Sequence, residues 1–307
     1  MQSFSVLKQI FENNLTEIEE WAHTMNLELF SNPIIRCLSA RINNPEKFKA
    51  ITLFGDGHDS RIDYNSSEVL KKLDMLDMYS YKLEKPGLRT ASVVDINGFG
   101  ILHSESLSCK DNTDAPMMKK LRPDRIMKNT DCLMLDGGYS SVGSTLILLH
   151  NNELLESDSD DKVLSENNFI IPIRKIKYVE FHPSEERYND EFGGLRSMIE
   201  TSFAELGNTF FFFHTNNPRK MIKHKIYNAK YNLAWLLLNI KKFVDKYNIP
   251  VLEHHEAWIE KDFDFPKIEL PLNLSERVEV EIEKQKEVLR KQTRLFQSML
   301  GETDENR

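Results

Sequence analysis

Cysteine is scarce in this chain of 307 residues, which has 3, at positions 37, 109 and 132. They are widely spaced and form no CxxC pair. This spacing argues against a disulfide framework and against a zinc site, and it favours reduced thiols. Cys132 lies in the apolar run Cys132–Leu135, where we expect a small buried thiol.

Long apolar runs are also missing. No stretch approaches the length needed to span a bilayer, and the N-terminus lacks the charged-then-apolar layout of a signal peptide. We therefore expect an intracellular protein without membrane association. With 40% hydrophobic and 29% charged residues, the chain has the balance of an ordinary globular protein, enough for one large domain or two smaller ones.

The chain has no overall excess of positive charge, since its formal net charge is −8. That argues against a role in binding nucleic acid, because phosphates are bound by Lys and Arg. The charge is nevertheless uneven: residues 151–161 contain acidic but no basic side chains, and residues 217–231 show the reverse. A local basic track remains compatible with the negative total. Its members are Arg219, Lys220, Lys223, Lys225 and Lys230.

Apolar spacing predicts a mixed order of helices and strands in the first half of the chain. Residues 1–30 show helical periodicity, and Asn-Pro pairs interrupt the region up to residue 45. Asn97-Gly98 lies between two β-rich runs, which is a strong hairpin signal. The predicted elements are strand 51–54, a polar helix near 66–77, and strands 79–83, 89–95 and 99–107.

In the second half, an acidic stretch separates strands from long helices. Residues 151–167 are acidic and contain serine, which favours a solvated loop or insertion. The order as a whole indicates a mixed α/β core with a helical N-terminal segment and a helical C-terminal tail. The predicted elements are helix 111–126, capped by Asp111 or Asn112, strands 132–135 and 169–173, and helices 186–206, 226–246 and 275–299.

Three acidic residues have the most informative contexts. Asp56 directly follows the apolar run Ile51–Phe54, and Asp136 follows Cys132–Leu135; glycines come next in both cases. We therefore expect both acids at strand ends. Glu200 lies in a stretch of helical periodicity. Hard divalent cations prefer oxygen ligands, so this set predicts a two-metal phosphoryl-transfer site.

Each acid also has a plain structural interpretation. Asp-Gly pairs are common in turns, and Asp59 suits a turn or an accessory acid. Glu200 follows Arg196 by four residues, the spacing of an ion pair on a helix surface. His58 could contact a phosphate or simply pack. The combination of the three acids, rather than any one of them, favours the metal site.

At these same residues the chain resembles the DDE-type transposases of the Harbinger/PIF group. The resemblance covers about residues 50–245, and its most specific elements are Asp136-Gly-Gly-Tyr and Arg196-x-x-Ile-Glu-x-x-Phe. The matching stretches are Phe54–His58, Tyr79–Thr90, Val93–Gly98, Asp136–Tyr139, Tyr188–Leu206 and Tyr231–Asn239.

The resemblance implies an RNase H-like mixed sheet flanked by helices that binds two Mg²⁺ or Mn²⁺ ions about 4 Å apart. Asp56, Asp136 and Glu200 would be both the catalytic residues and the metal ligands. It further implies an endonuclease and strand-transfer activity on DNA. The domains would be a helical segment at 1–48, the remnant of a DNA-binding module; a catalytic domain at 49–247; and a helical tail at 248–307.

DNA contacts are expected from basic side chains near the acids. On a strand edge, solvated charges without function are an equal alternative. The track Arg219–Lys230 is a second candidate on the same terms. The candidate contacts are His58, Lys82, Lys85, Arg89 and Arg196.

Few residues precede Asp56, so a full DNA-reading module is not evident. This shortness predicts a separate DNA-reading partner protein. The resemblance further implies a homo-oligomer as the active form and the nucleus as the location. The alternative is a catalytically silent, domesticated transposase that binds DNA or protein; a nuclease acting on RNA is a more distant one. Glu253–Glu256 resembles a metal-ligand run, but adjacent helical residues point about 100° apart, which disfavours a shared ion.

Overall fold

The computed structural model of this chain describes residues 11, 13–63, 79–110, 112–156, 163–214, 219–220, 224–247, 283, 286–287 and 290–291. The chain divides into two compact units, Met1–Lys242 and Phe243–Arg307. The sheet and all the predicted site residues belong to the first unit.

A mixed sheet is built around one long strand, β1 (Ile51–Asp63). β1 pairs antiparallel with β3 (Lys85–Asp95) and parallel with β6 (Cys132–Leu135). The order along the sheet is β2-β3-β1-β6-β7, and β7 is parallel to β6. Off this order, β4 and β5 pair with β3, and β8 pairs with β1. The bounds of the short strands are Tyr79–Ser80 for β2, Gly100–His103 for β4, Leu107–Ser108 for β5, Phe169–Ile170 for β7 and Arg219–Lys220 for β8.

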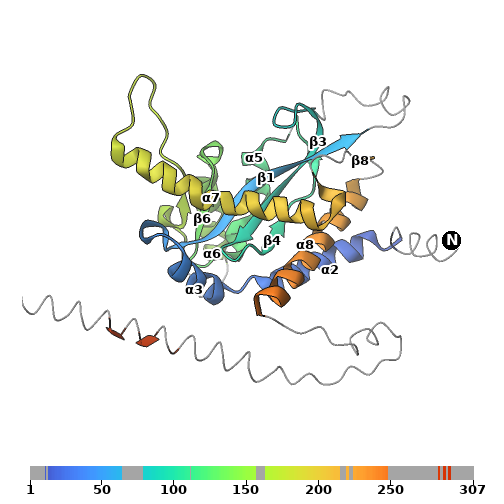
Figure 1. Cartoon of the computed structure of the whole chain (residues 1–307), viewed down its shortest axis with the longest axis horizontal. Helices are drawn as coiled ribbons and strands as arrows, with labels where there is room; N and C mark the ends of the chain where they lie inside the picture. Colours follow the sequence, from blue (N-terminus) through green and yellow to red (C-terminus); the bar gives the residue numbers. More distant parts are fainter. Residues whose placement is uncertain are drawn as a thin grey trace, which may run out of the picture. The chain divides into compact units, whose positions relative to one another are not determined.

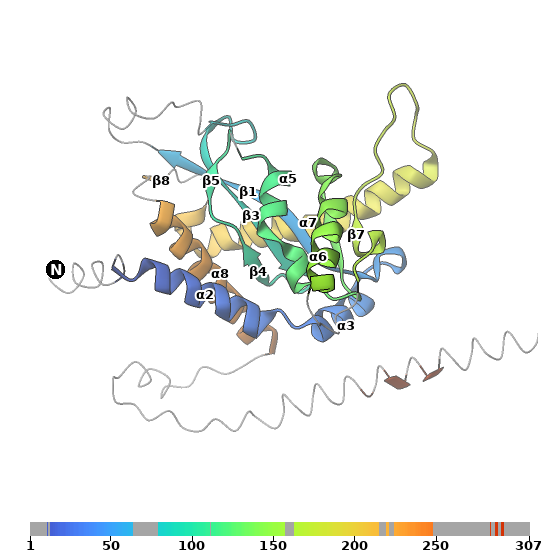
Figure 2. The same ribbon diagram turned by 180° about the vertical axis from the view of Figure 1, so that it is seen from behind.

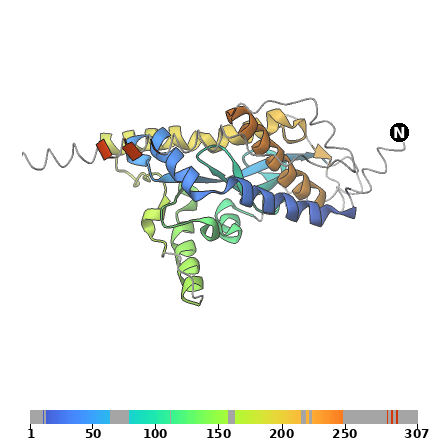
Figure 3. The same cartoon turned by 90° about the horizontal axis from the view of Figure 1, so that it is seen from below.

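Helices cover both faces of the sheet (Figures 1, 2 and 3). On one face lie the long helices α7 (Pro183–Thr209) and α8 (His224–Tyr247), and on the other lie α5 (Asp114–Leu121) and α6 (Val142–Glu156). Alternate residues of the strands supply the two cores. Phe54 packs in the α7 and α8 core, whereas its neighbour Leu53 packs in the α5 and α6 core. Burial on both faces explains the continuous apolar runs of β1 and β6.

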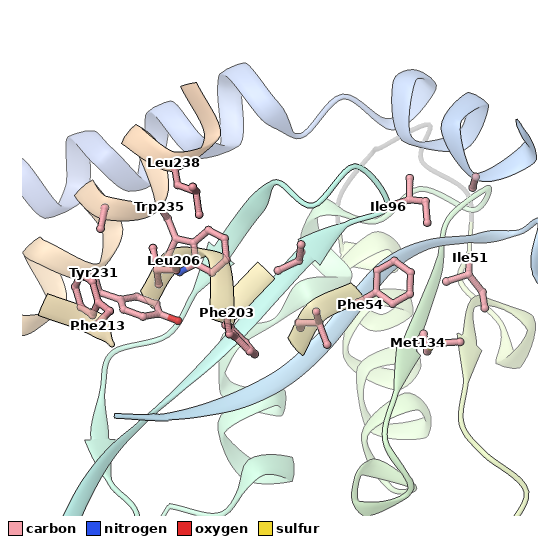
Figure 4. Packing of buried hydrophobic residues seen from close by; sticks show 14 of the residues in the cluster. Ile51, Phe54, Ile96, Met134, Phe203, Leu206, Phe213, Tyr231, Trp235 and Leu238 are labelled. Carbon is pink, nitrogen blue, oxygen red and sulfur yellow. The ribbon is translucent and has the colours of Figure 1, made fainter. Parts of the chain in front are cut away.

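Aromatic side chains fill the core between α7 and α8 (Figure 4). Trp235 of α8 is fully buried and meets Phe203 of α7 edge-on, with ring centroids 6.2 Å apart. The Trp235 ring also lies so close to Gly100 that no Cβ would fit at that position. α8 is thereby packed closely against β4.

Two N-terminal helices, α2 (Leu15–Phe30) and α3 (Pro33–Asn43), are part of the same packing. Arg36 of α3 is buried and binds both carboxylate oxygens of buried Asp131, at 2.7 and 2.6 Å. Asn239 of α8 donates to the side-chain oxygen of Asn26 in α2 at 2.9 Å. Charge and amide contacts thus fasten these helices to the sheet and to α8.

The elements agree with the sequence in part. Strand 132–135 has the predicted bounds, and Gly98, with φ +80°, makes the turn between the antiparallel strands β3 and β4. Helices 186–206 and 226–246 correspond to α7 and α8. The α/β class is confirmed.

Other boundaries were wrong. Strand 51–54 continues to Asp63, because β3 pairs with it as far as Arg61. Helix α5 is shorter than 111–126 and its N-cap is Thr113. Helix α6 was not predicted at all, and it extends to Glu156 within the predicted loop 151–167. Strand 79–83 ends at Ser80, and residues 99–107 form two short strands with a break between them.

Helix α3 was missed, although Asn32 caps it by accepting hydrogen bonds from the backbone of Ile34 and Ile35, and Pro33 occupies its first position. The predicted helix 66–77 and the run Glu253–Glu256 lie outside the described residues. So does most of 275–299, of which the five described residues are helical. No helix within the described part of the chain is long and apolar enough to cross a membrane.

Candidate metal centre

Asp56 lies in the middle of β1, not at a strand end as the glycines beside it suggested. It stands opposite Ser92 of β3, and its side chain is only 8% exposed. Its predecessor Gly55 pairs with Leu135, the last residue of β6. The parallel pairing of β1 and β6 therefore brings Asp56 beside Asp136.

Asp136 directly follows β6 and caps a short 3₁₀ helix, Gly137–Tyr139, accepting from the Gly137 N–H at 2.6 Å. Glu200 lies in the middle of α7, where Ile199 and Phe203 face the core. The side chains of Asp136 and Glu200 are 50% and 55% exposed. These two carboxylates are thus open to solvent, whereas Asp56 is not.

The Arg196 guanidinium lies among the three carboxylates. Its Nη2 is 3.1 Å from Asp56 Oδ2 and 3.6 Å from Asp136 Oδ2, and its Nη1 is 2.7 Å from Glu200 Oε1. The structure therefore brings together all three predicted acids. The i,i+4 ion pair between Arg196 and Glu200 is present as well, so the helix-surface interpretation and the site interpretation hold at once.

Asp56 is the acid of this group whose pKa is shifted by burial. Burial raises the pKa of its carboxyl, whereas the charges of Arg196 and Lys82 and the Gly57 N–H lower it, and Asp136 raises it slightly further. The Tyr139 hydroxyl donates to Asp56 Oδ1 at 3.3 Å, and the Gly57 N–H donates at 2.8 Å. A buried carboxylate with these partners is best satisfied by a cation.

A metal centre requires several ligand side chains close enough together to share one ion. Among the described residues, no three His, Cys, Asp or Glu side chains lie close enough together to share one metal ion. The carboxylates of Asp56, Asp136 and Glu200 are instead separated by the width of a guanidinium. All three offer oxygen donors, the ligand type that hard divalent cations prefer, but the position between them is taken by the Arg196 guanidinium.

A second charged group lies next to the first. Arg89 binds both oxygens of buried Asp59, at 2.6 and 2.8 Å, and lies 3.2 Å from Asp114. These hydrogen bonds raise the pKa of Arg89. Asp114, at the start of α5, sits so close to Gly57 that a Cβ there would collide with its carboxylate. Sequence reasoning missed Asp114, whose only local signal was a helix start.

Among the other predicted DNA contacts, His58 is packed against the core, whereas Lys82 and Lys85 are exposed. The His58 ring packs 4.7 Å from the Phe203 ring, and burial lowers the pKa of His58 to about 4. Lys82 is exposed in the β2–β3 turn, close enough for its charge to lower the pKa of Asp56 and Asp59. Lys85 is exposed at the start of β3. In the basic track, Lys230 lies over the Phe212 ring at 4.6 Å.

The loop from residue 171 to 182, between β7 and α7, also reaches the site. The Arg174 guanidinium donates to the Gly137 carbonyl oxygen, next to Asp136. No prediction included this loop, although its sequence Arg-Lys-Ile-Lys-Tyr combines three basic residues with one aromatic residue. Comparisons with protein-family models, with curated proteins and with solved structures give no match. The resemblance to Harbinger/PIF transposases stays a prediction.

Proposed function

We propose that this protein is a metal-dependent DNA endonuclease and strand-transfer enzyme of the DDE type, with Asp56, Asp136 and Glu200 as its catalytic acids. The observation that supports this proposal is their convergence on one cationic group, Arg196. These carboxylates come from a central strand, from the residue after its parallel neighbour and from a covering helix, the three places from which the acids of such a site are expected.

The sheet supports an RNase H-like core within this proposal. β4 pairs antiparallel with β3, and β3 pairs antiparallel with β1, whereas the β1–β6 and β6–β7 pairs are parallel. The first acid lies on the central strand and the second at the end of the adjacent parallel one. This is the arrangement expected of an RNase H-like two-metal site.

Two Mg²⁺ or Mn²⁺ ions, when bound, would activate a water or a DNA 3′-hydroxyl and stabilise the leaving oxygen. The protein would supply the ligands: Asp56, held by Gly57 and Tyr139, as the fixed one, and Asp136 and Glu200 as the open ones. A cation would remove the cost of burying the Asp56 charge. Lys82, on the β2–β3 turn, would attract the phosphate backbone.

The space beside the acids suits an extended substrate. A Cβ built on Gly138 meets no atom within 4 Å. Gly138 follows Asp136 by two residues. The absence of a side chain there would let a phosphate backbone approach the carboxylates closely.

One observation favours a second candidate function. Arg196 already places one positive charge in contact with the three acids, as a permanent counter-ion would. In that case the protein would be a catalytically silent, domesticated transposase that binds DNA or protein. A separate DNA-reading partner, a homo-oligomeric active form and a nuclear location belong to the proposal in either case.

The deciding experiment is Mn²⁺-dependent cleavage of labelled plasmid DNA by the wild type and by Glu200→Gln. We expect cleavage by the wild type alone, because the amide keeps the shape of Glu200 and loses its negative charge. Direct calorimetry with Mn²⁺ on Asp136→Asn tests the same site without turnover, and metal binding should be lost. Glu191→Gln, an exposed acid of α7 outside the group, is the matched control and should change neither result.

Absence of cleavage by a folded wild type that still binds Mn²⁺ would favour the silent protein. Unchanged metal binding by Asp136→Asn would contradict the metal site itself.

A further inference from the structure

The loop from residue 171 to 182 stands out beyond the N-terminal end of α7 (Figure 1, yellow-green). Its base is fastened to the fold: the Asn189 side chain of α7 accepts from the Ile173 N–H at 2.9 Å and donates to the Ile173 carbonyl at 3.0 Å. Arg174, the next residue, is hydrogen-bonded to Gly137 at the acid site. The base of the loop therefore borders Asp136.

The tip has an unusual surface composition. Ile176 is 70% exposed and Tyr178 is 90% exposed, so two large, mainly apolar side chains face solvent on either side of Lys177. The turn is defined, since the Val179 N–H donates to the Ile176 carbonyl at 3.0 Å. Tyr178 has φ +68°, a left-handed conformation that is uncommon for an aromatic residue and concentrates at functional sites.

Basic groups accompany this exposed ring. The Lys177 ammonium lies 4.8 Å from the centre of the Tyr178 ring, and Lys175 is paired with Glu180 at 2.6 Å across the loop. An exposed aromatic ring combined with cations is the combination that binds unpaired nucleotides, the ring by stacking on a base and the cations through phosphates.

We propose that this loop binds an unpaired DNA strand beside the acid site, with Tyr178 stacking on a base and Lys177 contacting the backbone. Tyr178 follows Arg174 by four residues, a reach of at most about 14 Å, or roughly two nucleotides. The exposed Tyr178 ring can stack on the face of a base only where that base is not already stacked in a duplex, so the loop fits an unpaired strand.

This inference rests on the proposed function for its choice of DNA, but it is tested without catalysis. Anisotropy of a fluorescein-labelled single-stranded oligonucleotide is measured in EDTA with the full chain. Tyr178→Ala should weaken binding about fivefold or more, because one base loses its stacking partner, and Tyr178→Phe should retain wild-type binding. Lys177→Ala should lower the slope of log affinity against log salt by about 0.7.

Matched controls come from exposed residues elsewhere. Trp21 of α2 is 53% exposed and Lys47 has a 57% exposed side chain, so Trp21→Ala and Lys47→Ala remove the same kinds of group. Neither should change binding, and melting curves verify that all variants fold.

If the wild type and Tyr178→Ala bind the single strand equally well, the proposal for the loop is overturned, and the proposed function is unaffected. The proposal for the loop is also overturned if a fully paired duplex binds as tightly and suffers the same loss. A wild type that binds no oligonucleotide overturns it together with the DNA substrate of the proposed function, whereas loss of metal binding by Asp136→Asn bears on the metal site only.

Discussion

Arg196 is the residue on which the chemistry of the site depends. Its side chain is 24% exposed and contacts all three carboxylates. One of these belongs to Asp56, whose side chain is only 8% exposed. Buried carboxylates without a cation are costly, so some positive group must be present. A divalent ion and this guanidinium would therefore compete for the same oxygens.

Replacing Arg196 with Met should expose that competition. Without metal, the variant should lose about 1–3 kcal/mol of stability, because Asp56 keeps its burial and loses its partner. Affinity for Mn²⁺ should rise about tenfold or more, since a positive charge a few ångströms away no longer repels the ion. Urea unfolding in EDTA and calorimetry with Mn²⁺ measure the two effects.

Lys47→Met is the control for this variant, because Lys47 forms a comparable but exposed pair with Glu191 at 3.3 Å. It should alter stability little and metal affinity not at all. An Arg196→Met protein with wild-type Mn²⁺ affinity would show that the guanidinium does not occupy the position of a metal.

At the scale of elements, the hairpin β3–β4 positions the strand that pairs with Asp56. Asp95 closes its turn: one carboxylate oxygen accepts from the Asn97 and Phe99 N–H groups, each at 2.9 Å. The carboxyl is buried, and burial raises its pKa to about 6 although those hydrogen bonds oppose the shift. The carboxyl that closes the turn therefore loses its proton at a higher pH than an ordinary aspartic acid.

The hairpin should make stability depend on pH. The folded pKa of Asp95 lies above the ordinary value of 3.8, so the folded state binds a proton more tightly than the unfolded chain. The stabilisation is complete below pH 3.8 and is lost as pH rises through about 6. NMR titration of the Asp95 carboxyl carbon should give a midpoint near that pH, and an ordinary midpoint would contradict this.

At the scale of the whole molecule, the N-terminal helices are part of the packed unit that contains the sheet. Arg36 neutralises Asp131, whose oxygens also accept from the Thr52 hydroxyl at 2.6 Å and from the Lys128 N–H at 2.8 Å. The group lies where β6 begins, one strand length from Asp136. Residues 1–48, predicted as a separate segment, thus contain the counter-ion of a buried acid in the sheet.

A chain starting at residue 49 should therefore fail to unfold cooperatively in urea. Deleting one partner of a buried ion pair costs about 3–5 kcal/mol, a large share of a domain's stability. Arg36→Met in the full chain tests the same contact alone and should lower the free energy of unfolding by a similar amount. Arg41→Met, an exposed arginine of the same helix, is the control. A fragment 49–307 with the wild-type midpoint would contradict this role of α3.

The sequence by itself determined the α/β class, strand 132–135, the Asn97-Gly98 turn and the two long helices, because these depend on apolar spacing and turn chemistry within short windows. It also singled out the three acids and the ion pair of Arg196 with Glu200. It could not give the length of β1, since residues 55–61 are held as strand by pairing with β3.

Only the tertiary structure decided that the three acids lie together around Arg196. Asp56 and Asp136 become neighbours because β1 and β6 pair in parallel, and Arg196 reaches both because α7 crosses that part of the sheet. The same holds for Asp114 over Gly57 and for Arg174 at Gly137. Contacts between residues distant in the chain depend on how packed elements are positioned, and no local pattern in one sequence encodes that.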